Sequence, residues 1–74
     1  MRSREVNRRI ERLGGMMVRQ VGPHRRYVAI YTDAAGREAT VATTVPQHAG
    51  DIPAGTLRAI ERDLAPALGK RWLR

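Results

Sequence analysis

The fold is decided by residues 25–45, RRYVAIYTDAAGREATVATTV, which hold two β-rich segments around a polar turn. Val, Ile, Thr and Tyr dominate residues 25–31 and 38–45, and these side chains favour strands. The turn at residues 32–37 contains Asp and Gly, and Pro46 closes the second segment. We therefore expect two antiparallel strands joined by this turn.

The chain before this stretch predicts a third strand and a helix. Residues 16–20, MMVRQ, precede a Val-Gly-Pro break, so they form a hairpin with residues 25–31. Further upstream, apolar residues recur at i, i+4 and i+7, which predicts a helix over residues 4–13 that ends at a Gly-Gly pair. Ser3 is its candidate N-cap. The apolar positions of this helix are Val6, Ile10 and Leu13.

The chain after the stretch predicts a second helix. Asp51 or Thr56 is its candidate N-cap, and Pro53 is tolerated in the first turn. Pro66 breaks or restarts the helix because proline lacks an amide hydrogen. Trp72 is expected to dock onto the core. The apolar face of this helix contains Leu57, Ile60 and Leu64.

The element order predicts an α+β fold, α-β-β-β-α, in which a three-stranded antiparallel sheet carries both helices on one face. Pairing Val28 with Val41 and with Met16 puts most apolar strand residues on one side. In this register Val18 pairs with Arg26. We expect the helices to cover Met16, Val18, Val28, Ile30, Val41 and Val45, and Met17, Arg19, Tyr27 and Tyr31 to face outward.

Composition limits the classes of function. A chain of 74 residues is expected to form a single domain over residues 1–74. Thirteen Arg and one Lys against seven acidic residues give a net charge of +7, which favours a polyanion or an acidic protein as partner. The absence of Cys excludes disulfides and a thiolate nucleophile. We expect no membrane partner and a cytoplasmic location, because no long apolar segment or signal peptide is present.

Both histidines are predicted to lie at one end of the sheet. His24 begins the second strand with helix-side parity, and His48 follows the third strand. Both helices are expected to begin at this end, so their unpaired amide groups would bind an anion there. A His beside a Gly-Pro turn can also be a simple packing residue, and this alternative stays open.

Metal and cofactor chemistry are not expected. Two His without a third ligand make a poor zinc site, and the seven carboxylates are scattered along the chain. Ser3 is the only serine and is better explained as a helix cap than as a nucleophile. We therefore predict no metal and no cofactor.

Two segments carry a family resemblance. Residues 18–27, VRQVGPHRRY, resemble the Val-Arg-Gln-x-Gly-Ser-His segment of HicA-type mRNA interferase toxins, except that Pro23 replaces the usual Ser. Residues 44–48, TVPQH, with residues 50–60, GDIPAGTLRAI, are similar to that family's second segment. The resemblance implies a fold like the double-stranded-RNA-binding domain. It also implies ribosome-independent cleavage of mRNA and inhibition by an acidic HicB-type antitoxin.

The resemblance assigns the catalytic role to His24. We expect a metal-independent reaction in which the RNA 2′-hydroxyl attacks the adjacent phosphate, with His24 as general acid or base. His48 is the possible second proton-transfer group. The residues expected to bind RNA or position its phosphates are Arg19, Gln20, Gly22, Arg25, Arg26, Thr56 and Arg58.

Two functions of other classes stay open at this point. A non-catalytic RNA-binding module would use the same fold and charge. A small interaction protein could instead use its basic face only to bind an acidic partner. We expect the antitoxin to bind at the His24 end, with Arg19 and Arg25 on the open face and Arg26 at its rim.

Overall fold

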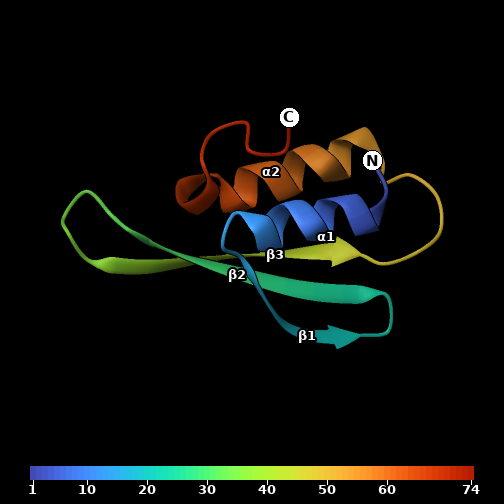
Figure 1. The fold of residues 1–74 in the computed structure, drawn as a ribbon, viewed down its shortest axis with the longest axis horizontal. Coiled ribbons are helices and arrows are strands. Elements are labelled where there is room, and N and C mark those ends of the chain that lie inside the picture. The colour runs from blue at the N-terminus through green and yellow to red at the C-terminus, as the bar shows by residue number, and fades with distance from the viewer.

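The computed structural model describes all of residues 1–74 and has the predicted element order (Figure 1). The three strands form one antiparallel sheet in the order β1-β2-β3, so the α+β prediction is confirmed. Neither helix is long and apolar enough to cross a bilayer. The elements are α1 (Ser3–Arg12), β1 (Met16–Val21), β2 (His24–Thr32), β3 (Glu38–Pro46) and α2 (Ala54–Leu68).

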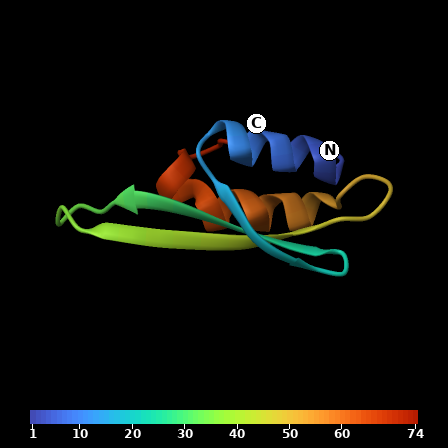
Figure 2. The ribbon, with the colours of Figure 1, turned by 60° about the horizontal axis from the view of Figure 1, so that its bottom comes forward.

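Both helices lie on the same face of the sheet, and the other face is uncovered (Figures 1 and 2). We call the uncovered side the open face. The core lies between the helices and the sheet, and the predicted docking of Trp72 is confirmed. The buried apolar side chains are Val6, Ile10, Tyr27, Ala29, Val45, Ile52, Ile60, Leu64, Trp72 and Leu73.

The strand register differs from the prediction by one residue between β2 and β3. Met16 pairs with Val28 as predicted, but Val28 pairs with Ala42, and Ala29 takes Val41 as its partner. Since side chains alternate between faces, a shift of one residue moves the side chains of β2 to the other face. The predicted faces of β2 are therefore wrong.

The shift buries Tyr27 and Ala29 and leaves aliphatic side chains on the open face. Tyr27, predicted to face outward, is 0% exposed. Met16, Val18 and Ile30, predicted to be buried, are 50%, 52% and 50% exposed. On β3 the prediction is correct, because Val45 is buried and Val41 is packed against the core.

A bulge in β1 accounts for the other error in register. The pairing is irregular between Met17 and Arg19, so Arg26 pairs with Arg19 instead of Val18. A bulge adds one residue to one strand and changes which side chains share a face. The alternation of side chains between the two faces of β1 therefore does not continue past Met17.

Two buried hydroxyl groups of the sheet have hydrogen-bond partners on the helices. The Tyr27 hydroxyl donates a hydrogen bond to Glu11 Oε2 at 2.7 Å. The hydroxyl of Thr43, which is also buried, donates to Asp63 Oδ2 at 2.9 Å. A carboxylate on each helix thus satisfies a buried polar atom of the sheet. Of the two residues, only Tyr27 was predicted to face outward, because Thr43 shares the helix-side parity of Val41 and Val45.

The helix ends also differ from the prediction. Ser3 lies in the first turn of α1, and Arg2 is the N-cap residue, whose amide donates to Glu5 Oε1 at 3.0 Å. Pro53 occupies the N-cap position of α2, so neither predicted cap residue is used. This proline can precede the first turn because the amide groups there have no helical partner.

Pro66 does not break α2, which continues to Leu68. A proline in a helix removes one hydrogen bond and crowds the preceding turn. Ala67 and Leu68, which follow it, pack against the core. Their burial offsets the lost bond, so the helix ends only at Gly69, whose φ is 103°.

Candidate functional site

One end of the molecule gathers the predicted site elements. The β1-β2 turn, the end of β3 and the starts of both helices lie at this end (Figure 1). The Ile52 amide donates to the Met1 carbonyl at 2.8 Å, so the segments that precede α1 and α2 are joined. The predicted convergence of the helix N-termini is confirmed.

His24 lies on the open face of the sheet. It is the first residue of β2, pairs with Val21 and Pro46, and is exposed to solvent. Its parity matches that of Arg26 and opposes that of the buried Tyr27. The prediction that His24 faces the helices is therefore wrong, and the helix N-termini lie on the other side of the sheet.

Two arginines share a shallow hollow with His24. Arg26 Nη1 donates to Thr44 Oγ1 at 3.0 Å, which holds the guanidinium over the end of β3. No carboxylate lines this hollow, whose volume is about 250 Å³. The side chains that line the open-face site are Arg19, Val21, His24, Arg26 and Thr44.

A two-residue turn places His24 at this position. Gly22 has a φ of 57°, in the left-handed region that glycine adopts without strain. Pro23 follows, and its fixed negative φ suits the second position of a type II′ turn. The Gln47 amide donates to the Pro23 carbonyl at 2.6 Å and joins the turn to the end of β3. Gly22 thus shapes the turn, and Pro23 fits it in place of Ser.

Arg25 points to the helix side, although we had expected it on the open face. Its Nε donates to Gln20 Oε1 at 2.7 Å, and Gln20 Nε2 donates to the Gly22 carbonyl at 3.1 Å. Arg25 also lines a groove with Arg4 and Glu11 of α1. Gln20 and Arg25 are therefore separated from His24 by the sheet.

His48 lies in a different hollow from His24. Its side chain is exposed beside Arg2 and Arg4 at the start of α1, and Nδ1 is 3.3 Å from the Ala49 carbonyl oxygen. The structure does not bring the two imidazoles together. No group of three or more His, Asp or Glu side chains that could hold a metal ion is found in the chain.

Thr56 and Arg58 do not line the open-face site either. Both belong to α2, and Arg58 lines hollows on the side of that helix that faces away from the sheet. Of the predicted site residues, only Arg19, His24 and Arg26 share one hollow.

Sequence reasoning missed three polar residues near the site. Thr44 holds Arg26, and the correct register would have paired the two. Asn7 and Gln47 exchange two side-chain hydrogen bonds, of 2.7 and 3.0 Å, and so tie α1 to the chain that follows β3. The contact spans forty residues, and no local pattern indicates it.

The fold changes the pKa of the Tyr27 hydroxyl. Burial raises the pKa of its hydroxyl above the usual value of 10.0, and the hydrogen bond to Glu11 raises this pKa further. Arg25 lowers the same pKa to a smaller extent. Tyr27 is therefore a neutral hydrogen-bond donor that supports β2 beneath the open-face site.

Comparison with known proteins supports the resemblance seen in the sequence. The family described as the HicA toxin of bacterial toxin–antitoxin systems matches residues 3–65, from the start of α1 to near the end of α2. No curated protein and no solved structure matches the chain. The family match includes all three strands and the open-face site. The chain therefore belongs to the HicA family of bacterial toxins.

Proposed function

We propose that this toxin is a metal-independent endoribonuclease that cuts mRNA without the ribosome, with His24 as its catalytic residue. The observation that carries the proposal is an exposed imidazole that shares the open-face site with two guanidinium groups. Arg19 and Arg26 supply positive charge, and His24 supplies an imidazole that can accept or donate a proton. RNA cleavage requires both properties at one phosphate.

The reaction is an internal transfer at phosphorus. The 2′-oxygen of the RNA forms a bond to the adjacent phosphorus, and the bond from phosphorus to the 5′-oxygen of the next nucleotide breaks. His24 accepts the 2′-hydroxyl proton, and the departing 5′-oxygen takes up a proton from water. DNA lacks the 2′-hydroxyl and is not cut. The products are a 2′,3′-cyclic phosphate and a free 5′-hydroxyl.

Arg19 and Arg26 stabilise the negative charge that the phosphate gains in the transition state. Thr44 accepts a hydrogen bond from Arg26, so the guanidinium is already placed before RNA binds. Donors that are fixed in advance need no rearrangement during the reaction, which is why such groups lower the barrier. Arg19 and Arg26 are the phosphate-binding residues of the proposal.

His24→Ala tests the assignment. A positioned acid or base contributes about 10² to 10⁴ in rate, whereas RNA affinity is spread over several arginines. The purified variant should therefore bind RNA nearly as well as the wild type but release no fragments. If the variant cuts RNA at the wild-type rate, His24 is not the catalytic residue.

His48→Ala is the matched variant, because it removes the other imidazole from a hollow that does not contain His24. We expect it to retain cleavage. Loss of cleavage in both variants would make His48 the second proton-transfer group. Wild-type protein that binds RNA and releases no fragments would be a non-catalytic RNA-binding module.

The proposed partner is an acidic antitoxin of the HicB type. The open-face site is basic and lacks carboxylates, and half-exposed Met16 and Ile30 continue the same face. A protein that covers this face would bury these apolar side chains and block His24 together.

A further inference from the structure

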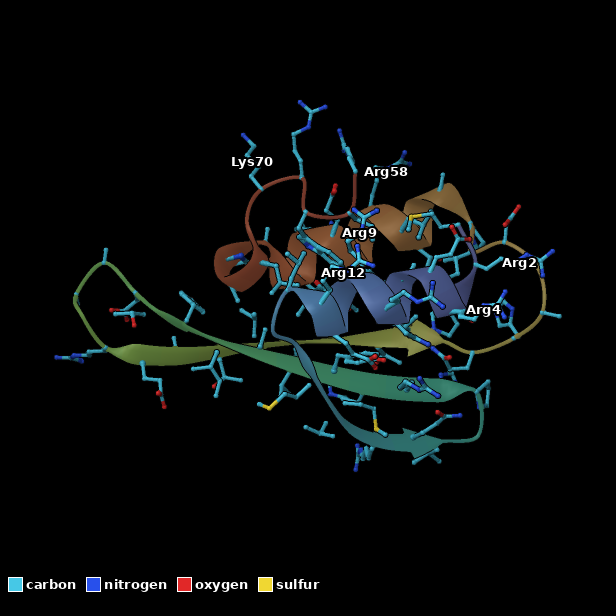
Figure 3. The ribbon with its side chains drawn as sticks, in the orientation of Figure 1. Arg2, Arg4, Arg9, Arg12, Arg58 and Lys70 are labelled. Atoms are coloured by element: carbon cyan, nitrogen blue, oxygen red, sulfur yellow. The ribbon has the colours of Figure 1, made fainter.

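A second cationic hollow lies on the side of α2 that faces away from the sheet. In Figure 3, Arg58 and Lys70 extend beyond the helices, on the side opposite to the strands. The hollow has a volume of about 610 Å³ and lies between α2 and the turn that follows it. Its charged lining residues, which define the α2 hollow, are Arg58, Glu61, Arg62, Lys70, Arg71 and Arg74.

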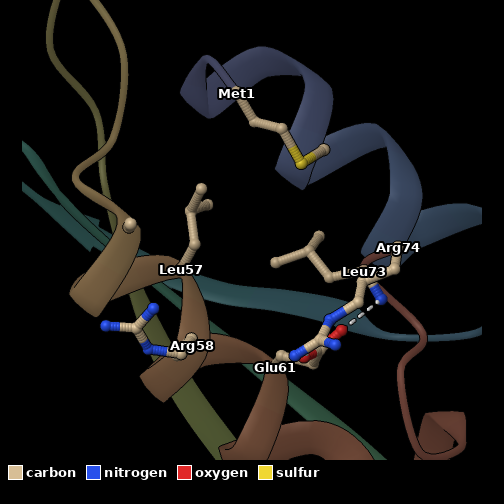
Figure 4. A pocket seen from close by; sticks show the side chains of 7 residues that line it. Met1, Leu57, Arg58, Glu61, Leu73 and Arg74 are labelled. Carbon is tan, nitrogen blue, oxygen red and sulfur yellow. Dashed lines mark hydrogen bonds and ion pairs between the residues drawn. The ribbon is translucent and has the colours of Figure 1, made fainter.

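The positive charge of the α2 hollow is largely uncompensated. Glu61 is its one carboxylate, and Glu61 Oε1 lies 3.3 Å from Arg74 Nε (Figure 4). The other oxygen, Oε2, accepts a hydrogen bond from the Leu73 amide at 3.2 Å. The remaining four cationic side chains have no acidic partner within ion-pair distance: Arg58, Arg62, Lys70 and Arg71.

The chain after α2 is held firmly enough to keep these cations in place. Trp72 Nε1 donates to the Glu61 carbonyl at 2.7 Å, and the Trp72 carbonyl accepts a hydrogen bond from Arg9 Nη1 at 3.2 Å. Trp72 and Leu73 are both buried. The terminal segment is therefore docked on both helices, and its charged side chains start from fixed positions.

The backbone of Arg71 also indicates that the segment after α2 has a defined conformation. Its φ is 70°, and it is the only residue other than glycine with a positive φ. A side chain in the left-handed region brings its Cβ close to the following carbonyl oxygen, which is sterically unfavourable. This turn leaves Arg71 exposed at the hollow while its neighbour Trp72 is buried.

The α2 hollow combines the family's helix with chain that the family match does not cover. The match ends at residue 65, whereas Lys70, Arg71 and Arg74 come later. The hollow is therefore not a copy of the open-face site. It uses different residues on the opposite side of the molecule.

The chemistry of the lining favours phosphates over a protein partner. Ala65 is the one apolar residue that lines the hollow, whereas protein interfaces bury an apolar centre. Arg is the side chain best suited to two-point contact with phosphate. Exposed apolar side chains such as Ile30 lie on the open face instead.

We propose that the α2 hollow is a second RNA-binding site, which holds backbone phosphates outside the segment that is cut. The proposal rests on the proposed function in one respect, namely that the ligand is RNA. A strand bound at His24 would reach the hollow only by passing around the edge of the molecule. Long RNA would therefore bind more tightly and with a steeper salt dependence than the open-face site alone allows.

The test compares two double variants in the His24→Ala background, so that RNA stays intact. Arg58→Gln/Arg62→Gln removes two unpaired cations of the hollow, and Arg12→Gln/Arg37→Gln removes the same charge from residues that line neither surface. The probe is long single-stranded RNA, and its dissociation constant is measured over a range of salt concentrations. Circular dichroism and thermal melts check that both variants fold.

We expect the hollow variant to bind roughly tenfold more weakly at physiological salt and to lose about 0.7 in log–log salt slope per phosphate contact. The control should change far less. Equal loss in both variants would overturn the proposal, because net charge alone would then explain binding. Unchanged RNA affinity with weaker antitoxin binding would also overturn it and assign the hollow to a protein. Wild-type protein that binds RNA but releases no fragments would reject the ribonuclease function, and weaker binding by the hollow variant than by the control would still support this site.

Discussion

The Tyr27 hydroxyl donates a 2.7 Å hydrogen bond to Glu11 Oε2 and so joins the middle of β2 to α1. The ring is fully buried, and the contact fixes which face of β2 meets the helices. His24 and Arg26 lie at positions of the opposite parity. One buried contact thus determines that the imidazole and this arginine lie on the open face.

Tyr27→Phe should lower the free energy of unfolding by about 0.5 to 1.5 kcal/mol at neutral pH, the usual net value of one hydrogen bond. The aromatic packing is retained, so the fold and the open-face site should persist. Chemical denaturation of the variant and the wild type measures the difference. A variant as stable as the wild type would mean that the hydrogen bond makes no net contribution.

The raised pKa of Tyr27 predicts that the protein loses stability at alkaline pH. The pKa of Tyr27 is higher in the folded state than the unfolded value of about 10, because burial and Glu11 disfavour the phenolate. The folded state then binds more protons, so stability falls as pH rises from about 10 through the folded pKa. Tyr27→Phe should flatten this fall relative to the wild type. Equal slopes in the variant and the wild type would contradict the assignment.

Arg26→Glu should slow association with the antitoxin by roughly tenfold at low salt and reduce the salt dependence of the rate. Arg26 lies on the open face, where the acidic partner is proposed to bind. Arg25→Glu is the matched control, because this neighbour lies on the helix side beside α1. Association rates measured by surface plasmon resonance distinguish the effects of Arg26→Glu and Arg25→Glu.

A larger effect from Arg25→Glu would place the antitoxin on the helix side. Inhibition would then be indirect, because His24 would stay exposed in the complex. Hydrogen exchange of the complex would show the same difference through protection of either the open face or α1.

Chelation by EDTA should leave RNA cleavage unchanged, because the proposed reaction assigns proton transfer to His24 and charge stabilisation to Arg19 and Arg26. Cleavage is measured on gels with protein purified in the presence and absence of chelator. Complete loss that Mg²⁺ or Mn²⁺ restores would replace the proposed mechanism with a metal-assisted one.

Trp72→Ala should lower the free energy of unfolding by about 3 to 5 kcal/mol, the usual cost of removing a buried aromatic side chain. It also removes the hydrogen bond to the Glu61 carbonyl. Trp72→Phe keeps most of the packing and should lower the free energy of unfolding by less than Trp72→Ala does. Thermal melts of both variants measure the difference, and an unchanged melting temperature in Trp72→Ala would show that the terminal segment is not docked.

The number, order and type of the helices and strands follow from the sequence alone. Alternating β-branched residues, a Gly-Pro turn and helical spacing of apolar residues are local signals, and each lies within one segment. The pairing of Met16 with Val28 agrees with the prediction, but the two-residue turn at Gly22 and Pro23 does not set it. That turn alone would pair Met16 with Ala29, and the bulge in β1 shifts the register by one residue. The family resemblance rests on the same local segments.

Contacts between distant elements determine which face of β2 is buried, and hence where His24 lies. Counting aliphatic residues put Val28 and Ile30 in the core, but Tyr27 and Ala29 are the buried residues of β2. The Tyr27 hydroxyl donates its hydrogen bond to Glu11 on α1. A polar atom can be buried when it has a hydrogen-bond partner. That partner lies sixteen residues away along the chain, so no pattern within a strand could reveal it.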